Sequence, residues 1–138
     1  MYLIDTDVIS DFRKAEKANA GVLAFFDKAE RDEAAVYLSV ITIGELRKGV
    51  DALRHRGDEP QAAQLEKWFK RLASDYAGSI LSFDEDAAQV WGRLCAPNPE
   101  NPIDKQIAAT ALIYDLTVVT RNSAHYAPTG VKLLNPFT

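Results

Sequence analysis

The stretch from Tyr2 to Ser10 constrains the fold of this chain more than any other part of its sequence. It opens with a short apolar run, Tyr2-Leu3-Ile4, which is too short for a helix and is typical of a buried strand. The run ends at Asp5, and a helical pattern of apolar residues follows. A carboxylate between a strand and a helix lies at the carboxyl end of that strand, the edge where open α/β sheets bind ligands.

Strand patterns and helix patterns alternate along the rest of the chain. The predicted strands span residues 2–4, 36–39, 79–83, 116–120 and 131–134. The predicted helices span about residues 8–14, 20–31, 42–55, 60–76 and 103–114, with a further helix capped by Asp84 and carrying residues 87–95. This alternation predicts an α/β fold with a mostly parallel five-stranded sheet covered by helices on both faces, and the short last strand is expected at an edge.

The bulk composition is that of one ordinary globular domain covering residues 1–138. The chain shows no repeat, low-complexity segment or linker that would divide it. The net charge of −4 argues mildly against a protein that binds nucleic acid through bulk positive charge. It leaves open an enzyme that reaches phosphates through bound metal ions.

The cysteine count and the absence of long apolar runs favour a cytoplasmic protein. Cys95 is the only cysteine, so no internal disulfide can form, which suits a reducing compartment. No signal-like segment precedes the first strand, and no apolar run approaches the 18 residues or so of a membrane span. We therefore expect a soluble chain with no membrane partner.

Four side chains are expected at one edge of the predicted sheet. Asp5 follows the first strand, Glu45 and Asp104 are predicted in the first turns of their helices, and Asn122 follows the fourth strand. Carboxylates packed together repel one another, and a divalent cation removes that conflict. Oxygen ligands suit Mg²⁺ or Mn²⁺, and the chemistry that follows is hydrolysis of a phosphodiester.

Each of the four also has a purely structural explanation. Asp5 is a good helix cap, and Asp104 suits the positive end of a helix. Glu45 stands three residues after Thr42, in the pattern of a capping box. Asn122 is a common turn residue. Taken one at a time these explanations are at least as good as the functional one, so the functional interpretation depends on all four meeting in space.

Other candidates carry weaker signals. His55 and His125 are too far apart to suggest a metal site or a triad, and we assign neither a role beyond the surface or a loop. Cys95 lies on an apolar stripe and is expected in the core. Positive charge is concentrated on two predicted helices, either as a solvated face or as a rim that attracts phosphates. Those residues are Arg47, Lys48, Arg54, Arg56, Lys67, Lys70 and Arg71.

Four segments, in chain order, resemble the motifs of PIN-domain toxins of the VapC type. They are Leu3–Ser10, Ser39–Gly49, Asp104–Ala111 and Val118–Asn122, and the chain end Leu134–Phe137 also looks familiar in this family. One such segment is weak evidence, but four in order across almost the whole chain are specific. The resemblance implies a single PIN domain, a three-layer fold with a parallel five-stranded sheet between helices.

The resemblance also implies an activity and a site. PIN toxins of this type are Mg²⁺- or Mn²⁺-dependent endoribonucleases that cut structured cellular RNA and arrest growth. Asp5, Glu45 and Asp104 match the family's metal-binding acids, which are also its catalytic residues. Thr6 and Thr120 match hydroxyl positions near that site.

The expected partners follow from the same resemblance. It implies a cognate VapB-type antitoxin whose tail enters the cleft, often with an arginine among the acids. It further implies a toxin homodimer within a higher hetero-oligomer. Operator DNA is expected to be contacted only through the antitoxin.

Two positions depart from the family's pattern. This chain has Asp7 where the family commonly has Asn, and Asn122 where it commonly has Asp. A neutral ligand at Asn122 is expected to weaken a second metal site, so we expect one well-held ion. Asp7 is expected to point away or to support the site indirectly. His125 stands where many relatives carry an acid before an aromatic residue, and we assign it no role.

Two other functions remain open at this point. The spacing of Asp5 and Asp7 is that of haloacid-dehalogenase phosphatases, in which the first aspartate becomes phosphorylated. Ile9 replaces the usual Thr or Val of that motif, and no downstream lysine motif is evident. The other alternative is a non-catalytic scaffold that holds metal or antitoxin, with its nuclease activity lost through Asn122.

Overall fold

The computed structural model describes all residues from 1 to 138, and its centre is a five-stranded, wholly parallel sheet. The strand order is β3-β2-β1-β4-β5, so the first strand of the chain is the central one. The strands are β1 Tyr2–Ile4, β2 Val36–Ser39, β3 Ile80–Leu81, β4 Thr117–Val119 and β5 Lys132–Leu134. The predicted five-stranded parallel sheet and the edge position of β5 are confirmed.

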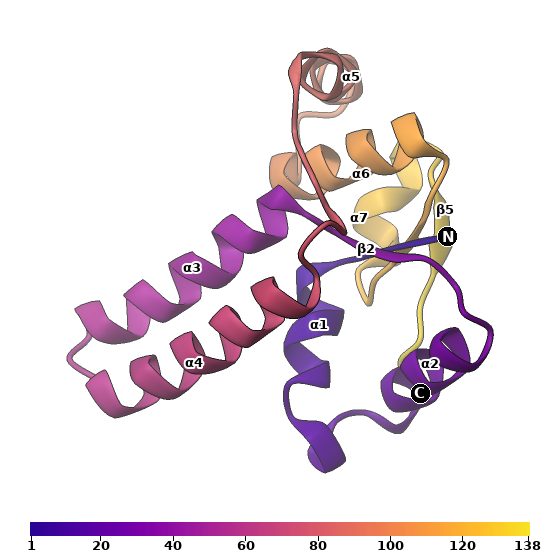
Figure 1. Ribbon diagram of the computed structural model, residues 1–138. Helices are drawn as coiled ribbons and strands as arrows, with labels where there is room; N and C mark the ends of the chain where they lie inside the picture. Colours follow the sequence, from indigo (N-terminus) through magenta and orange to yellow (C-terminus); the bar gives the residue numbers. More distant parts are fainter.

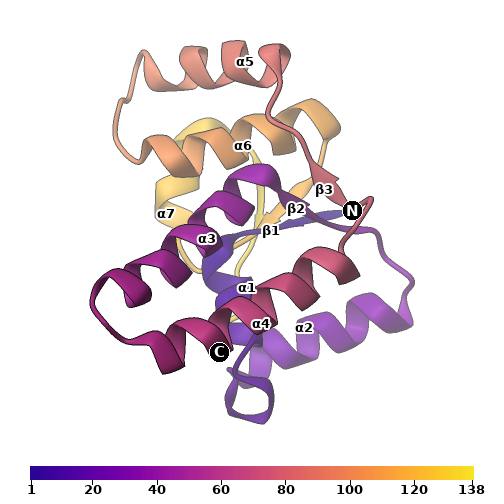
Figure 2. The ribbon, with the colours of Figure 1, turned by 60° about the vertical axis from the view of Figure 1, so that its left-hand side comes forward.

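Helices cover both faces of this sheet (Figures 1 and 2). The α-helices are α1 Thr6–Phe12, α2 Ala20–Arg31, α3 Val40–His55, α4 Glu59–Asp75, α5 Glu85–Cys95, α6 Pro102–Tyr114 and α7 Ser123–Tyr126. Two 3₁₀ turns are η1 Ala15–Lys17 and η2 Ala127–Thr129. None of the helices is both long enough and apolar enough to cross a bilayer.

Two apolar clusters lie on opposite faces of the sheet and define the three layers. Leu3 belongs to one cluster and its neighbour Ile4 to the other, and both side chains are fully buried. Alternation along a strand sends successive side chains to opposite faces, so β1 is buried on both sides. The first cluster joins the sheet to α1, α2, α3 and α4, and the second joins it to α6 and α7. This central position of β1 fixes Asp5 at the middle of the carboxyl edge.

The start of α3 differs from the prediction. The helix begins at Val40, because the Ser39 hydroxyl caps it by accepting a hydrogen bond from the Ile41 N–H at 3.0 Å. Thr42 therefore lies within the helix rather than at its cap, and its side chain is buried. The prediction that Thr42 and Glu45 form a capping box is wrong. Glu45 lies in the second turn, not the first, so helix capping does not explain its carboxylate.

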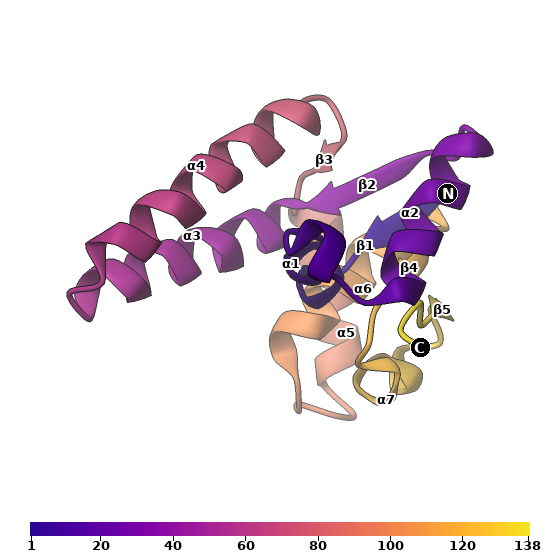
Figure 3. The same cartoon turned by 90° about the horizontal axis from the view of Figure 1, so that it is seen from below.

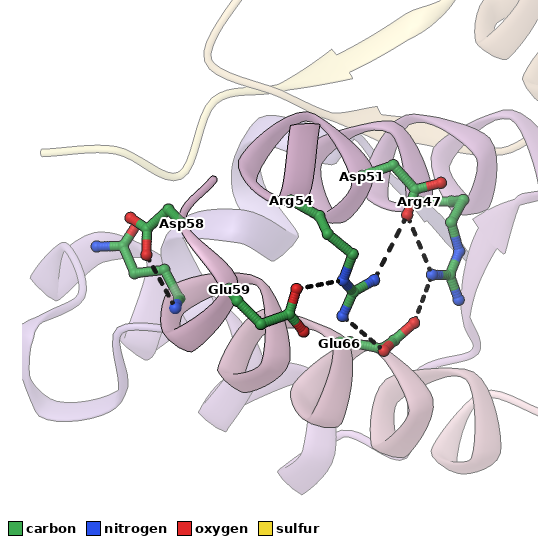
Figure 4. A network of polar contacts seen from close by, with 7 residues as sticks. Arg47, Asp51, Arg54, Asp58, Glu59 and Glu66 are labelled. Carbon is green, nitrogen blue, oxygen red and sulfur yellow. Dashed lines mark hydrogen bonds and ion pairs between the residues drawn. The ribbon is translucent and has the colours of Figure 1, made fainter. Parts of the chain in front are cut away.

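Helices α3 and α4 run side by side and project from the body as an arm (Figures 1 and 3). Ion pairs join them: Glu66 on α4 accepts hydrogen bonds from Arg47 at 2.6 Å and Arg54 at 3.1 Å. Arg54 also pairs with Glu59 at 2.9 Å, and Asp51 lies near both arginines (Figure 4). Arg47 and Arg54 are two of the positive residues that could have attracted phosphates, and both are paired with carboxylates within the arm.

Candidate active site

Asp5 lies where the sequence places it, at the carboxyl end of β1, and it also caps α1. Its Oδ1 accepts a hydrogen bond from the Thr6 N–H at 2.8 Å, and its Oδ2 accepts one from the Thr120 hydroxyl at 2.7 Å. The residue is only 3% exposed. The Asp5 side chain thus both caps α1 and lies at the edge of the sheet where ligands bind.

The environment of Asp5 disfavours its charged form. Burial is the main cause, and the negative charge of Asp7 adds to it, with a smaller contribution from Asp104. The hydrogen bonds from Thr120 and Thr6 act in the opposite direction. Burial and the two neighbouring charges outweigh these hydrogen bonds, so the pKa of Asp5 rises from 3.8 to about 7. A carboxylate with this pKa is well suited to a bound cation, which restores the charged form.

Asp7 belongs to the same acidic group. Its Oδ2 accepts a hydrogen bond from the Arg121 N–H at 3.0 Å, while its Oδ1 is buried and has no hydrogen-bond partner. Burial raises the pKa of this carboxyl also, and Asp104 contributes to the rise. One oxygen of Asp7 therefore holds the start of the segment after β4, and the other is buried without a partner.

Glu45 reaches the edge from α3 and is held by α1. Its Oε1 accepts a hydrogen bond from the Thr6 hydroxyl at 2.6 Å, and Thr6 Oγ1 also lies 3.1 Å from the hydroxyl of Thr42. The Thr6 N–H donates a hydrogen bond to Asp5, so Thr6 connects the carboxylates of Asp5 and Glu45. Thr6 thus lies beside the acids, as the sequence predicts.

Asp104 is in the first turn of α6, as predicted, and it contacts a residue to which the sequence assigned no role. Nδ1 of His125, on α7, lies 2.8 Å from Oδ2 of Asp104. The assignment of His125 to a surface or loop role was incomplete, because α7 brings its ring to the acidic edge. The one signal in the sequence was its position, three residues beyond Asn122.

Tyr126 is the second residue of α7 that the sequence analysis missed. Its side chain is fully buried, and its hydroxyl has no hydrogen-bond partner of ordinary geometry. Burial raises the pKa of the phenol strongly, and the nearby charges of Asp5 and Asp104 add to the effect. The phenol therefore stays neutral, and its proton is available beside the carboxylates.

Asn122 makes no side-chain contact with the acids. It precedes α7 without a side-chain capping bond, and its backbone N–H donates to the Thr120 hydroxyl at 3.0 Å. Since Thr120 in turn donates to Asp5, the backbone at position 122 supports the orientation of Asp5. The structure thus brings Thr120 into the site by direct contact and Asn122 only through it.

The acidic edge suits a hard divalent cation that keeps most of its water. No three His, Cys, Asp or Glu side chains lie close enough together to form a ready-made protein cage for a metal ion. Mg²⁺ rarely needs one, because it binds through one or two carboxylates, several waters and substrate phosphates. Asp5 and Asp7, whose carboxyl pKa values are both raised, have oxygen donors of the kind that such an ion prefers.

The sheet is parallel in the order β3-β2-β1-β4-β5, and Asp5, Glu45 and Asp104 lie at its carboxyl edge. This combination of fold and site defines a class of protein. The family model of the PIN domain matches residues 2–129, and the chain belongs to the PIN-domain family. This confirms the resemblance drawn from the four sequence motifs.

Within this family the chain is similar over its full length to named toxins and ribonucleases. It is 34% identical to the VapC ribonuclease Y4jK of Sinorhizobium fredii, over 99% of this chain and 98% of that protein. It is 34% identical to the toxin FitB of Neisseria gonorrhoeae, over 99% of each chain. The crystal structure of FitAcB from Neisseria gonorrhoeae superposes with a TM-score of 0.82 at 33% identity, covering 99% of this chain and 98% of that one.

Proposed function

We propose that this chain is a divalent-metal-dependent endoribonuclease that acts as the toxin of a toxin–antitoxin pair. Its full-length similarity to a VapC ribonuclease and to the FitB toxin supports this proposal. The observation that carries it is the environment of Asp5, a buried carboxyl with a pKa near 7 beside two further acids. No positively charged side chain pairs with the Asp5 carboxylate. A divalent metal ion would supply the missing positive charge, and this is why the site suits a metal-dependent nuclease.

The proposed roles follow from the contacts. Asp5 and Asp104 hold Mg²⁺ or Mn²⁺, with Glu45 completing the catalytic acids and Asp7 supporting them. When bound, the ion would lower the pKa of a water molecule and neutralise charge on the phosphoryl oxygens of RNA. Thr120 orients Asp5 through its hydroxyl.

Three further side chains act on these acids. Thr6 fixes the angle of Glu45 through a 2.6 Å hydrogen bond. His125 holds one oxygen of Asp104, leaving the other free. The neutral hydroxyl of Tyr126 is a proton donor beside Asp5 and Asp104, where it stabilises a negatively charged group without adding charge.

The partners in this proposal are structured cellular RNA and a cognate VapB-type antitoxin. An excess of buried carboxylates attracts a cationic side chain as well as a metal ion, so an antitoxin arginine is a suitable inhibitor of the same site. We further propose a homodimer within a higher complex in the cytoplasm, with operator DNA bound through the antitoxin.

A non-catalytic scaffold that holds metal or antitoxin, its nuclease activity lost through Asn122, is the second candidate. One observation favours it: the Asn122 side chain forms no hydrogen bond with the acids. The phosphatase alternative is weaker. Ile9 stands where the phosphatase motif has Thr or Val, and no downstream lysine motif is evident.

The experiment that separates these functions is cleavage of total cellular RNA by antitoxin-free protein with Mg²⁺, with Mn²⁺ and with EDTA. Asp5→Asn protein, purified in the same way, is the control for contaminating nucleases. The nuclease proposal expects discrete fragments that require metal and disappear in the variant. Equal fragments from both proteins, or no cleavage by folded wild-type protein with metal, would overturn it, and the latter would favour the scaffold.

A further inference from the structure

A hollow lies directly beside the candidate active site. It is a cleft of about 330 Å³ between the start of α3 and the start of α6, two segments that lie next to each other in Figures 1 and 2. This volume is at the lower end of the range for small-ligand sites, roughly 300–1,000 Å³. Residues that line it include Val40, Gly44, Glu45, Lys48, Ile103 and Gln106. Because Glu45 belongs to both, the cleft opens into the acidic edge.

Two exposed apolar side chains flank this cleft from different helices. Val40, the first residue of α3, is 41% exposed, and Ile103, at the start of α6, is 43% exposed. A third apolar residue, Ile41, also lines the cleft. Exposed apolar side chains of this kind can pack against the face of an aromatic ring, which is itself apolar.

The polar residues of the cleft suit the remaining parts of a nucleotide. Lys48 lies one turn after Gly44 on α3 and forms no ion pair within the chain, so its ammonium group is available to a phosphate. This separates Lys48 from Arg47 and Arg54, which are paired within the arm. Gln106, on α6, offers an amide that can both donate to and accept from the edge of a base.

Gly44 leaves the α3 side of the cleft open. A Cβ atom added to Gly44 would meet no other atom within 4 Å, so packing does not require glycine here. Glycine inside a helix costs about 1 kcal/mol relative to alanine, so helix stability does not favour it either. Its effect is to keep the helix surface bare at the point where the cleft meets Glu45.

We propose that this cleft binds one unpaired nucleobase of the RNA substrate, next to the phosphodiester held at the acidic edge. Val40 and Ile103 contact the ring, Gln106 contacts its edge, and Lys48 binds a phosphate of the same strand. Sequence-selective proteins bind RNA largely through such splayed-out bases. The inference rests on the proposed nuclease function and assigns the choice of cleavage position to α3 and α6.

The first test fills the cleft without touching a carboxylate. In Gly44→Leu, the new side chain projects into the cleft, and the replacement of a helical glycine keeps or raises stability. Gly92→Leu is the matched control, because Gly92 also lies in a helix with no atom within 4 Å of an added Cβ, but on α5 and outside the cleft. We expect Gly44→Leu to lower cleavage at the wild-type positions at least tenfold, while Gly92→Leu cleaves as wild type does.

The second test measures binding without cleavage. Methyl resonances of Val40 and Ile103 are followed by NMR while adenosine or uridine monophosphate is added, with ribose 5-phosphate as the control that lacks a base. The proposal expects both methyl groups to shift with a nucleotide, not with ribose 5-phosphate, and to stop responding in Gly44→Leu. Equal shifts with ribose 5-phosphate, or none with either nucleotide, would overturn it.

The outcomes distinguish this inference from the nuclease proposal. If wild-type protein cleaves RNA and Gly44→Leu gives the same fragments at the same rate, the base site is wrong and the nuclease stands. If wild-type protein cleaves no RNA, but nucleotides shift both methyl groups, the base site stands and the nuclease is wrong. Broadening of the two methyl signals with protein concentration alone, without a response to nucleotides, would show that a second copy covers the cleft and would overturn the proposal.

Discussion

At the scale of single residues, each acid of the candidate site is in contact with a neighbouring side chain: Thr120 with Asp5, Thr6 with Glu45 and His125 with Asp104. Asp5 and Asp104 were predictable because each stands next to a clear strand or helix boundary. The position of Glu45 within its helix was not, because Ser39 competes with Thr42 as the cap and the structure uses Ser39. His125 was missed because its contact with Asp104 depends on the packing of α7 against α6, which leaves no periodic signal in the sequence.

The raised pKa of Asp5 predicts a specific dependence of stability on pH. Between pH 3.8 and about 7, the unfolded chain loses the Asp5 proton while the folded chain keeps it, so the free energy of unfolding falls as pH rises through this window. The rise in pKa from 3.8 to about 7 corresponds to on the order of 4 kcal/mol. In EDTA we expect Asp5→Asn to exceed wild type in stability by about this amount at pH 8, and by little near pH 4.

Urea unfolding of both proteins across this pH range checks the prediction, since asparagine also caps helices well. Asp84→Asn is the matched control: Asp84 caps α5 through the Ala87 N–H at 3.0 Å, on the exposed surface. It reports the effect of the same substitution at a helix cap on the surface. A pH-independent difference for Asp5→Asn would contradict the account of its burial.

The contact between His125 and Asp104 predicts a second effect. Removing a hydrogen-bond partner that orients a metal-binding carboxylate typically costs 10–100-fold in metal affinity or activity. We expect a loss of about this size in His125→Ala, measured as Mn²⁺ affinity by calorimetry and as RNA cleavage. His55→Ala, at the exposed end of α3, is expected to behave as wild type. Equal values for both variants would show that His125 only packs against the surface.

At the scale of elements, long helices with a clear apolar stripe were predicted within one or two residues. The short helix α1 was predicted two residues too late in the chain, at 8–14, and the four-residue α7 was not predicted at all. The ranges of α2 and β2 match the prediction. Asn19 caps α2 by accepting a hydrogen bond from the Gly21 N–H, and Ser39 ends β2 because it caps α3. Helix α7 has only four residues, too few to form a helix alone, so tertiary contacts form it. Because α7 carries His125 and Tyr126, the least predictable element holds the residues that were missed.

The arm of α3 and α4 supports a prediction about salt. Glu66 accepts hydrogen bonds from both Arg47 and Arg54, and all three side chains are in contact with solvent. We expect Glu66→Gln to lower the melting temperature at low ionic strength, and the difference from wild type to shrink in 1 M NaCl, where charge interactions are screened beyond roughly 3 Å. Glu30→Gln, on the exposed face of α2, serves as the control. A loss in Glu66→Gln that is independent of salt would mean that packing, not charge, joins the two helices.

At the scale of the whole molecule, the alternation of strands and helices predicted a parallel α/β sheet, but not its strand order. The order depends on which strands pair across long stretches of chain, and β1 pairs with β4 more than a hundred residues away in the sequence. Local patterns carry no information on such pairs. The convergence of the acids was therefore a hypothesis until the strand order was known, and the order places β1, β2 and β4 side by side at the centre.

Metal binding is expected to stabilise the whole domain, because an ion that binds only the folded chain shifts the unfolding equilibrium. At 100 times the dissociation constant the gain is about 2.7 kcal/mol. We expect Mn²⁺ to raise the melting temperature of wild-type protein, and to leave Asp5→Asn unchanged. Thermal unfolding followed by circular dichroism, with and without Mn²⁺, checks this. An equal rise in both proteins would place the ion elsewhere.

The pairing of the central first strand with the fourth has a consequence for how the protein is made. On a ribosome, Asp5 is synthesised among the first residues, yet Thr120, which holds its Oδ2, follows 115 residues later. Until β4 and α7 have left the exit tunnel, Asp5 lacks its partner and β1 lacks one of its two neighbouring strands. A nascent chain therefore cannot carry an assembled cluster of acids, and a prematurely terminated translation product that stops before β4 is expected to be harmless to the RNA around it.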